Sequence, residues 1–254
     1  MYRIDFCPSC GSQNTKKELA ELSQFIVWMV LDQFNYTNTQ TYAVVCNDCS
    51  FIGCGLRLLP DEETKLYKNY RGEDYTNKRI FCEPWYKDYI ETFDRVKHNE
   101  ERRLKIDALI DKNVDRVYIN SVLDVWGGNG EHIPIKFIKA KKYVYNVTPT
   151  INLPDVLNFN PPLHQTSVNF IMCCGALESQ SDPDVMMNII RKVMDQDSWL
   201  YLEVPYYDNP EYNVFHEHLN FWNLKSLEAF LNRFQLKIVD HSITNTISLL
   251  ARLK

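Results

Sequence analysis

Over the second half of the chain, short apolar runs alternate with segments in which apolar residues recur every three or four positions. Runs of the first kind predict buried strands, and segments of the second kind predict amphipathic helices. The expected strands lie at 122–125, 143–147, 155–159, 168–173 and 199–204, and 236–241 pairs with 246–253. This alternation predicts an α/β fold, with helices on both faces of a doubly wound, mostly parallel seven-stranded sheet of the Rossmann-like kind.

Three helices are expected between these strands. The first covers residues 131–142, with Pro134 tolerated because it lies in the first turn. The second begins at Pro183 behind Asp182, since Asp at the N-cap and Pro at the first position are typical of helix starts. The third follows Asn223, which is expected to be its N-cap.

The first 115 residues have a different pattern. Apolar runs at 22–31 and 41–45 predict strands, and Pro60 with the acidic residues behind it predicts the start of a short helix. Residues 81–112 are rich in charge and have apolar positions at helical spacing, which predicts linking helices with a solvated face. The chain is expected to divide into a zinc-binding module at 1–75, linking helices at 76–115 and a Rossmann-like domain at 116–254.

The overall composition is that of an ordinary globular protein. The chain has 254 residues, of which 45% are hydrophobic and 24% charged, and it carries a net charge of −5. The acidic balance gives no reason to expect nucleic acid as a partner. No apolar run is long enough to cross a bilayer, and the N-terminus lacks the apolar segment of a signal peptide. We therefore expect a cytoplasmic protein that is not a membrane protein.

Two pairs of cysteines have the spacing of a metal site. Cys7 and Cys10 form one C-x-x-C pair, and Cys46 and Cys49 form the other. Each pair presents two thiolates from one tight turn, and two such turns complete a tetrahedral zinc site. The alternative is four unrelated thiols, but the spacing and the turn residues favour zinc. A site closed by four cysteines is structural, because no ligand position stays open.

A cluster of glycines follows the strand expected at 122–125. Gly127, Gly128 and Gly130 fall within four positions, although the whole chain has only 8 glycines. Backbone amides of such a loop can face a polar cofactor at the edge of the sheet, and a plain tight turn is the alternative. Asp124, at the end of the strand, can accept a hydrogen bond from a cofactor ammonium or can order the loop.

The best candidates for catalysis are His216, Glu217 and His218. They follow the strand at 199–204 and precede the helix capped by Asn223, so we expect them at the carboxyl edge of the sheet, where ligands bind. Histidine is the usual proton acceptor near neutral pH, and Glu217 can orient an imidazole or hold a substrate hydroxyl. A structural or surface role is the alternative, and a metal site lacks an obvious third ligand.

Three further residues are weaker candidates. Glu178 follows the strand at 168–173 and either lines the pocket or supplies a charge at a helix N-terminus. Tyr70 and Tyr75 either reach over the site from the N-terminal module or serve only in packing.

Taken together, these stretches resemble the class I S-adenosylmethionine-dependent methyltransferases. More narrowly, the chain is similar to the sugar C-methyltransferases, a group with an N-terminal zinc-binding domain. The likeness covers nearly the whole chain, but the further C-terminal domain of that group is expected to be absent, because the sequence ends at Lys254. The stretches that carry it are the cysteine pairs, the segment Leu66-Tyr-Lys-Asn-Tyr70, the glycine loop, residues 176–183 with 200–205, and residues 215–227.

The resemblance implies a set of ligands and roles. The cofactor would be S-adenosylmethionine, the metal structural zinc, and the substrate a small hydroxylated molecule such as a sugar or nucleotide-sugar. His218 would be the base and Glu217 would act near the substrate carbon, with His216, Tyr70 and Tyr75 at the same site. The residues implied to bind the cofactor are Asp124, Gly127, Gly128, Gly130, Thr148 and Glu178.

Several positions depart from the pattern of this family. Trp126 replaces the first glycine of the loop, and Thr148 stands where an acidic residue usually ends the second strand and binds the cofactor ribose. Asn169 replaces the acid that begins the fourth strand, Ser179 replaces a histidine, and Phe215 stands where the family often has tyrosine. These losses support an alternative, a catalytically impaired methyltransferase-like protein that serves as a binding partner or scaffold. The retained 216–218 cluster favours the enzyme.

Overall fold

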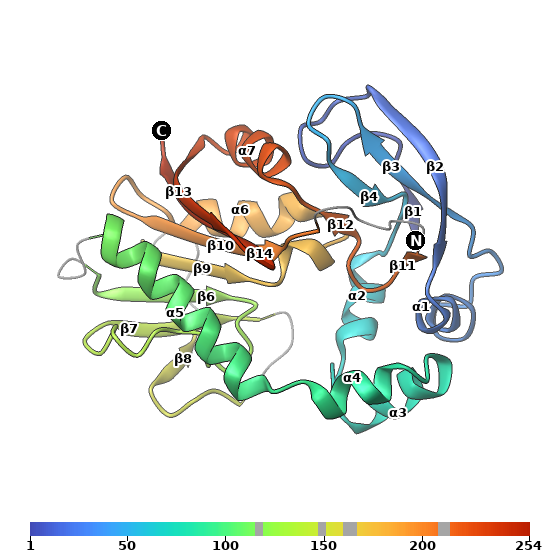
Figure 1. The fold of residues 1–254 in the computed structure, drawn as a ribbon, viewed down its shortest axis with the longest axis horizontal. Helices are drawn as coiled ribbons and strands as arrows, with labels where there is room; N and C mark the ends of the chain where they lie inside the picture. Colours follow the sequence, from blue (N-terminus) through green and yellow to red (C-terminus); the bar gives the residue numbers. More distant parts are fainter. Residues whose placement is uncertain (115–118, 147–150, 160–166, 208–213) are drawn as a thin grey trace.

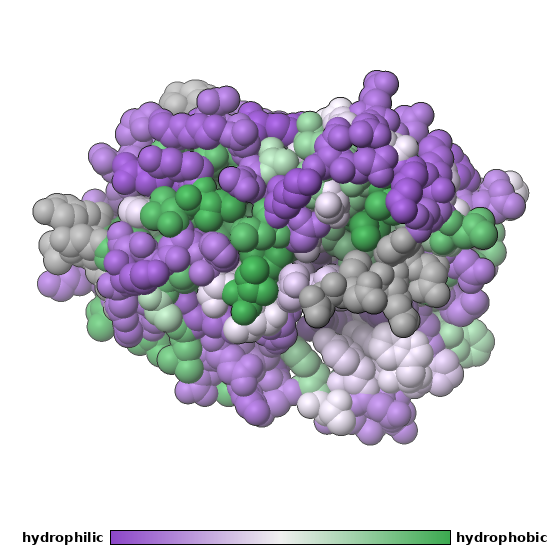
Figure 2. Space-filling model, turned by 45° about the horizontal axis from the view of Figure 1, so that its top comes forward, coloured by the Kyte–Doolittle hydropathy of each residue, from purple (hydrophilic) through white to green (hydrophobic). Residues whose placement is uncertain are grey.

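A computed structural model describes residues 1–114, 119–146, 151–159, 167–207 and 214–254. Figure 1 shows two lobes, a large one built on a twisted sheet and a smaller one that contains the N-terminus. The surface seen in Figure 2, which is turned by 45° from this view, is mostly hydrophilic, with apolar residues gathered across its middle. Within the described part of the chain, no helix combines the length and the apolar character needed to cross a membrane.

The large lobe has the seven-stranded sheet that the sequence predicts. Its strand order is β13-β14-β10-β9-β6-β7-β8, and β14 is antiparallel to both of its neighbours while all other neighbouring pairs are parallel. The order reverses between β6 and β9, which is where ligands bind in open sheets of this kind. The strands are β6 (Ser121–Val125), β7 (Lys141–Tyr145), β8 (Val156–Asn158), β9 (Phe170–Cys174), β10 (Trp199–Pro205), β13 (Leu236–Ile243) and β14 (Thr246–Leu253).

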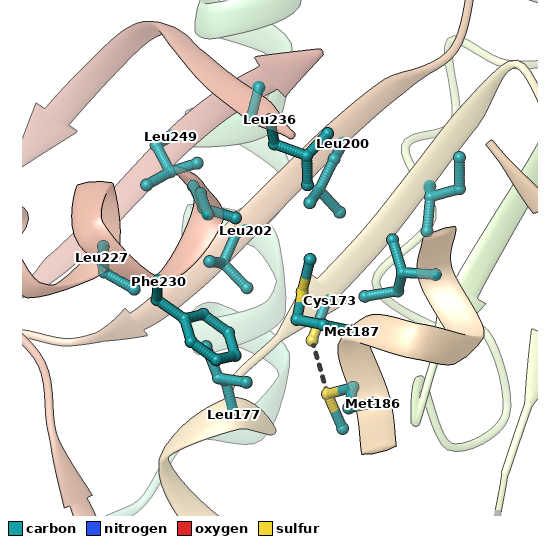
Figure 3. Close-up of a cluster of buried hydrophobic side chains, with 14 of the residues drawn as sticks. Cys173, Leu177, Met186, Met187, Leu200, Leu202, Leu227, Phe230, Leu236 and Leu249 are labelled. Atoms are coloured by element: carbon teal, nitrogen blue, oxygen red, sulfur yellow. Dashed lines mark hydrogen bonds between the residues drawn. The ribbon is translucent and has the colours of Figure 1, made fainter. Parts of the chain in front are cut away.

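Alternate side chains of these strands enter two separate cores. Leu123, Ile171 and Leu202 pack toward α6 (Pro183–Val193) and α7 (Leu224–Arg233), and Figure 3 shows part of this core. Val122, Phe170 and Tyr201 face the opposite way, toward α5 (Arg95–Asn113), which lies across the sheet in Figure 1. Helices therefore cover both faces, as the alternation of strands and helices predicts.

Two of the three expected helices begin where their capping residues predict. Asp182 accepts a hydrogen bond from the amide of Asp184 ahead of Pro183, and Asn223 accepts one from the amide of Ser226. Each cap satisfies a backbone donor that the first helical turn leaves unpaired, which stabilises a helix by about 1 kcal/mol.

The helix predicted at 131–142 is wrong. Residues 131–140 form successive tight turns, and β7 already begins at Lys141. The turns are closed by hydrogen bonds such as Ile133 N to Gly130 O and Phe137 N to Pro134 O, at 3.1 and 3.2 Å. Pro134 has no amide to continue an α-helical ladder. The apolar spacing still has a purpose, because Ile133, Phe137 and Ala140 are all buried in the core beneath α5.

The small lobe contains a five-stranded sheet with the order β11-β2-β3-β4-β12. Two of its strands come from residues 214–221, which the sequence analysis assigns to the Rossmann-like domain. The segment 216–218 therefore connects the two outer strands of this sheet. Its strands are β2 (Thr15–Leu22), β3 (Thr41–Cys46), β4 (Ile52–Cys54), β11 (Val214–Phe215) and β12 (Asn220–Phe221), and β1 (Tyr2–Arg3) pairs separately with β5 (Leu56–Arg57).

The strand predicted at 22–31 is also wrong. β2 ends at Leu22, and the chain then forms α1 (Gln24–Trp28) and a π-helical turn, η1 (Met29–Gln33). Phe25, Ile26, Met29 and Val30 are buried, and their spacing of one, three and one positions fits a helix. A continuous apolar run does not by itself distinguish a buried helix from a strand. Here the spacing of the buried residues shows the helix.

Further helices carry the chain from the small lobe to the sheet. α2 (Pro60–Tyr67) begins at the expected proline, and α3 (Glu73–Cys82), α4 (Tyr86–Thr92) and α5 follow. A short 3-10 helix, η4 (Leu177–Ser179), follows β9 and holds Glu178. Residues 216–218, η4 and α3 meet where the two lobes touch, and we call this contact region the seam.

Candidate functional site

The four predicted zinc ligands converge on one point. Their sulfur atoms all lie within 4.8 Å of one another, with Cys7 Sγ 3.5 Å from Cys49 Sγ and Cys10 Sγ 3.6 Å from Cys46 Sγ. A tetrahedral zinc with bonds of about 2.3 Å would hold its sulfurs about 3.8 Å apart. Four thiols at this separation fit zinc well. They are a candidate metal site, and a site closed by four cysteines would be of the structural kind.

This site lies at the joint between the lobes. The Ser9 hydroxyl donates to the carbonyl of Ser226 at 2.7 Å, and Arg233 donates to the carbonyl of Pro8 at 2.6 Å. The amide side chain of Asn223 donates to the carbonyl of Ser50 at 2.7 Å. The two cysteine turns are thus attached to both ends of α7. Metal binding would fix the small lobe against the core of the large one.

The glycine loop leaves β6 at Asp124, the carboxylate of which is fully buried. A Cβ on Gly127 would overlap that carboxylate, so only glycine fits there. Gly128 and Gly130 have φ angles of +60° and +86°, in the left-handed region that favours glycine. The Asn146 side chain, just beyond β7, accepts from Gly128 N at 3.1 Å and donates to Gly128 O at 2.8 Å. Thr148, implied to bind the ribose, lies outside the described residues.

Trp126 does not displace the loop. Its φ of +59° takes the left-handed conformation that a glycine would adopt, at a cost of about 1–2 kcal/mol for a residue with a side chain. Its amide donates to Tyr145 O at 2.6 Å, and its indole packs against the core beneath α6 and α7. The side chain therefore turns away from the core beneath α5, the face to which Asp124 belongs.

Asp124 lacks the partners that a buried carboxylate needs. Neither of its oxygens accepts a hydrogen bond from any residue that the structure describes. Burial raises the pKa of Asp124 to about 7, although the nearby cation of Arg102 opposes the shift. His132 Nδ1 lies 3.7 Å away, but burial and the charge of Arg102 lower the pKa of His132 to about 3, so it is neutral. Asp124 thus lacks a hydrogen-bond donor among the residues that the structure describes.

Arg102, on α5, lies between His132, the neighbour of Asp124, and Glu203 on β10. Its Nε donates to Glu203 Oε1 at 2.7 Å, and its Nη1 lies 3.1 Å from His132 Nε2. Glu203, on β10, also accepts from Tyr201 at 3.0 Å. Sequence reasoning missed this group. The available signal was Glu203, a charged residue inside an otherwise apolar strand, whereas Arg102 is indistinguishable from its neighbours in a charged run.

His218 faces Glu178 across the seam. Its Nδ1 is 2.8 Å from the Tyr207 hydroxyl, and its Nε2 is 3.9 Å from Glu178 Oε1. Desolvation, with the charges of His216, Arg71 and Arg79, lowers the pKa of His218 to about 4, and burial raises the pKa of Glu178 to about 8. Near neutral pH the pair is therefore an uncharged imidazole beside an uncharged carboxylic acid. Tyr207, at the end of β10, was also missed by sequence reasoning.

Glu217 points to the other side of its segment. It is buried and accepts hydrogen bonds from the Tyr75 hydroxyl and from Arg79 Nη1, both on α3. Arg79 also donates to Glu83 at 3.2 Å. The structure therefore brings together Glu217 and Tyr75, two residues to which the sequence analysis gives catalytic roles, in a buried ion-pair network.

The remaining predicted residues border this network. His216 Nδ1 lies 3.8 Å from Glu83 Oε1, and its ring lies against Trp85, so it does not share the surroundings of His218. Tyr70 is 41% exposed and packs edge-on against Tyr75, with ring centroids 5.1 Å apart. Tyr70 is thus open to solvent, whereas Tyr75 is not.

Comparison with known proteins gives structural neighbours only. No protein-family model and no curated protein sequence matches the chain. The Burkholderia thailandensis 1,6-didemethyltoxoflavin-N1-methyltransferase, solved with its substrate and S-adenosylhomocysteine, aligns with a TM-score of 0.54 and 13% identity over 87% of this chain and 98% of that one. A methyltransferase from Aquifex aeolicus aligns at 0.47 and 15% identity, over 64% and 100% of the chains.

A third neighbour is longer than this chain. The mitomycin 7-O-methyltransferase aligns with a TM-score of 0.48 and 12% identity, and the match covers 61% of this chain and 53% of that one. At such identities the likeness concerns the fold alone. In the described part of the large sheet, β14 runs antiparallel to both of its neighbours and the other pairs are parallel. This topology and the alignment with the first neighbour both indicate the Rossmann-like fold found in class I S-adenosylmethionine-dependent methyltransferases.

Proposed function

We propose that the protein is an S-adenosylmethionine-dependent methyltransferase that acts on a small hydroxylated substrate of the sugar type. The observation that carries the proposal is the buried, unpartnered carboxylate of Asp124 at the head of the glycine loop. It lies at the carboxyl edge of the sheet, beside the point where the strand order reverses. A buried charged group costs several kcal/mol unless it is paired, so its retention implies an external partner.

The residues present fit the cofactor. The ammonium of its methionine part would satisfy Asp124, and the guanidinium of Arg102 is placed to hold its carboxylate. The left-handed turns at Gly128 and Gly130 allow the backbone to approach a ligand closely. When bound, the cofactor supplies a methyl group carried on a sulfonium.

His218 is the proposed base. Because its pKa is lowered to about 4, the imidazole is unprotonated at neutral pH and can accept a proton. When Nδ1 donates to the Tyr207 hydroxyl, the lone pair of Nε2 is left facing the seam, where it can take the proton of a substrate hydroxyl. The neutral carboxyl of Glu178, 3.9 Å from Nε2, can donate a hydrogen bond to another substrate oxygen.

The electrical neutrality of this group favours a hydroxylated substrate. His218, Tyr207 and Glu178 together offer donors and acceptors with no net charge near pH 7. Hydroxyl groups match such a set, whereas a charged substrate would gain little there. A sugar or nucleotide-sugar that presents its ring hydroxyls to this group is the substrate class that we propose.

We further propose that zinc occupies the four-cysteine site and that the protein works in the cytoplasm. Cys7, Cys10, Cys46 and Cys49 are arranged for a metal, and the structure describes all 8 cysteines as free thiols. Thiols kept reduced are typical of that compartment. We also retain the division of the chain near residues 75 and 115 as a proposal.

Calorimetric titration tests the proposal. S-adenosylmethionine and S-adenosylhomocysteine should bind, whereas 5′-methylthioadenosine, which lacks the amino-acid end, should bind at least about tenfold more weakly. Absence of binding at millimolar cofactor would overturn the proposal. The variant His218→Ala should bind the cofactor normally and lose activity by about 10²–10⁴-fold in a screen of sugar acceptors.

The alternative, a methyltransferase-like binding protein, also has a specific observation behind it. Arg102 and His132 pack beside Asp124, and Asn146 holds both backbone groups of Gly128. If these contacts close the pocket permanently, the titration will show no binding of either nucleoside. A bound cofactor would eliminate this alternative.

A further inference from the structure

A fully buried asparagine lies two residues after His218. Asn220, in β12, donates from its Nδ2 toward three carbonyls of the turn at η4, those of Leu177, Glu178 and Gln180, at 3.1, 3.2 and 2.8 Å. The neighbouring amide of Leu219 donates to Glu178 O at 2.8 Å. The backbone that carries Glu178 is therefore attached directly to the backbone that carries His218.

The other end of this amide is held by a buried arginine. Arg57, in β5, donates from Nη1 to Asn220 Oδ1 at 2.7 Å and to Gln180 O at 3.3 Å. It is fully buried, and its Nε and Nη2 have no hydrogen-bond partner in the described chain. A buried guanidinium without a bound carboxylate is costly, which indicates that its contacts with Asn220 and Gln180 serve a purpose beyond stability.

Gly53 completes the unit. It pairs with Asn220 across β4 and β12, and a Cβ placed on it would lie 2.7 Å from Arg57 Nη2. Only a residue without a side chain leaves the guanidinium in its place. Gly53, Arg57 and Asn220 thus form a compact clamp, built from β4, β5 and β12, that closes on η4.

We propose that Asn220, held by Arg57, is the positioning residue that sets Glu178 against His218. The inference rests on the proposed function, because it assigns a purpose to the spacing of that pair. Asn220 touches neither substrate nor cofactor. It acts through the backbone, by fixing η4 on one side and the segment 216–218 on the other.

The clamp also accounts for the surroundings of the pair. His218 is faced by Tyr207 at the end of β10, by Glu178 on η4, by His216 on its own segment, and by Arg71 and Arg79 near and on α3. Glu178 is faced by Arg102 from α5 and Glu203 from β10, with Tyr67 from α2 nearby. The Glu178 side chain is 3% exposed, whereas that of His218 is 40% exposed. If η4 moves away from β12, water reaches Glu178 and the covered part of His218, and the desolvation of both groups weakens.

The test is the titration of His218 followed by NMR in the whole protein, with His218→Gln used to assign its signal among the 6 histidines. In the wild type the imidazole should titrate near pH 4. In Asn220→Ala, the pKa of His218 should rise by about one unit or more, because the imidazole gains water. In Asn113→Ala, a matched control, it should not change, because Asn113 pairs with Leu109 and Asp240 away from the seam.

A second variant tests the inference if Asn220→Ala does not fold. Gly53→Ala should displace the flexible end of Arg57, together with the ring of Phe51 that lies equally close, and produce a smaller rise in the same pKa. A folded Asn220→Ala or Gly53→Ala protein with an unchanged His218 titration would overturn the inference. Cofactor binding by the variants should equal that of wild type, so absence of binding in the wild type defeats the proposed function without deciding this inference.

Discussion

Glu217 and Asp124 are both carboxylates that are shielded from solvent, with exposures of 7% and 0%. Glu217 lies at the seam between the lobes and accepts hydrogen bonds from Tyr75 and Arg79. Asp124 lies at the carboxyl edge of the sheet and accepts none from the described residues. The chain itself supplies the hydrogen-bond donors of Glu217, whereas Asp124 needs a donor from a ligand.

The contrast separates two kinds of buried polar group. A fully paired carboxylate such as Glu217 fixes a segment in one position. Removing one of its partners would lower the stability of the fold. An unpaired carboxylate such as Asp124 weakens the free protein and becomes favourable when a cationic ligand arrives. We therefore assign the ion-pair network of Glu217 to support of the fold and the sheet edge at Asp124 to cofactor binding.

Loss of the metal should produce the largest effect on the seam. Removing zinc with a chelator, or Cys46→Ser, should lower stability on the order of 5–10 kcal/mol, because the metal would hold together the cysteine turns through which Pro8 and Ser9 bind α7. Elemental analysis and denaturant unfolding provide the measurement, and Cys82→Ser, outside the site, is the control. Protein purified without chelator and found free of metal would contradict the zinc assignment.

The second-largest loss of stability is expected when Glu217 loses its ion pair with Arg79. Arg79→Met leaves Glu217 buried without its cation and should cost about 3–5 kcal/mol in unfolding free energy. Arg95→Met removes an arginine whose side chain is 64% exposed beside Glu131, and it should cost less than about 1 kcal/mol. Equal costs for the two variants would show that Glu217 does not depend on its pair.

The unpaired edge predicts an unusual dependence of stability on pH. Asp124 and Glu178 titrate at about 7 and 8 in the folded protein, far above their ordinary values of 3.8 and 4.5. The folded state therefore takes up protons that the unfolded state does not, and stability should rise by about 2–3 kcal/mol as pH falls from 8.5 to 6.5. Below about pH 6.5 the rise should level off and then reverse at about pH 5, because the unfolded state protonates His132 and His218 whereas the folded state resists it.

The variant Asp124→Asn isolates the contribution of Asp124 to the change of stability with pH. It removes the ionisable group, so the free protein should be more stable than wild type at pH 8.5 and less dependent on pH. Asp197→Asn, at an exposed position, should leave the slope unchanged. The measurement is denaturant unfolding at several pH values. If stability depends on pH in Asp124→Asn as it does in wild type, the raised pKa of Asp124 is refuted.

The smallest effect is expected at Trp126. Trp126→Gly relieves about 1–2 kcal/mol of left-handed strain but loses the packing of the indole, so the net change in stability should stay within about 1 kcal/mol. Because the indole faces away from Asp124, the affinity for S-adenosylhomocysteine should change by less than about threefold. A gain of tenfold or more would show that Trp126 obstructs the pocket.

The large lobe could be predicted from the sequence because its signals are local. The buried strand β9 is a continuous apolar run, and in β10 only Glu203 interrupts one. The caps Asp182 and Asn223 mark helix starts within a few residues. The spacing of the two cysteine pairs likewise predicts that their four sulfurs converge, as the structure shows. The failures at 22–31 and 131–142 arose where an apolar run suits more than one period, or where one proline decides.

The site itself was less accessible from the sequence. Arg102, Arg79 and Asn220 act through partners more than 40 positions away, and nothing in their neighbourhood in the sequence marks them. The pairing of β11 and β12 with the N-terminal sheet brings Glu217 to Tyr75, and only the assembled fold shows it. Long-range pairings of this kind are set by topology rather than by local pattern.

The central claim is that a cofactor supplies the missing partner of Asp124, and the titration of that single carboxyl group tests it most directly. With aspartate carboxyls labelled with ¹³C and the signal assigned by Asp124→Asn, the free protein should give a pKa of about 7. Saturation with S-adenosylhomocysteine, which carries the ammonium without the sulfonium, should lower that pKa by several units, because a cation then faces the carboxylate. A pKa that stays near 7 in the saturated protein, or one that is already ordinary in the free protein, would contradict the account.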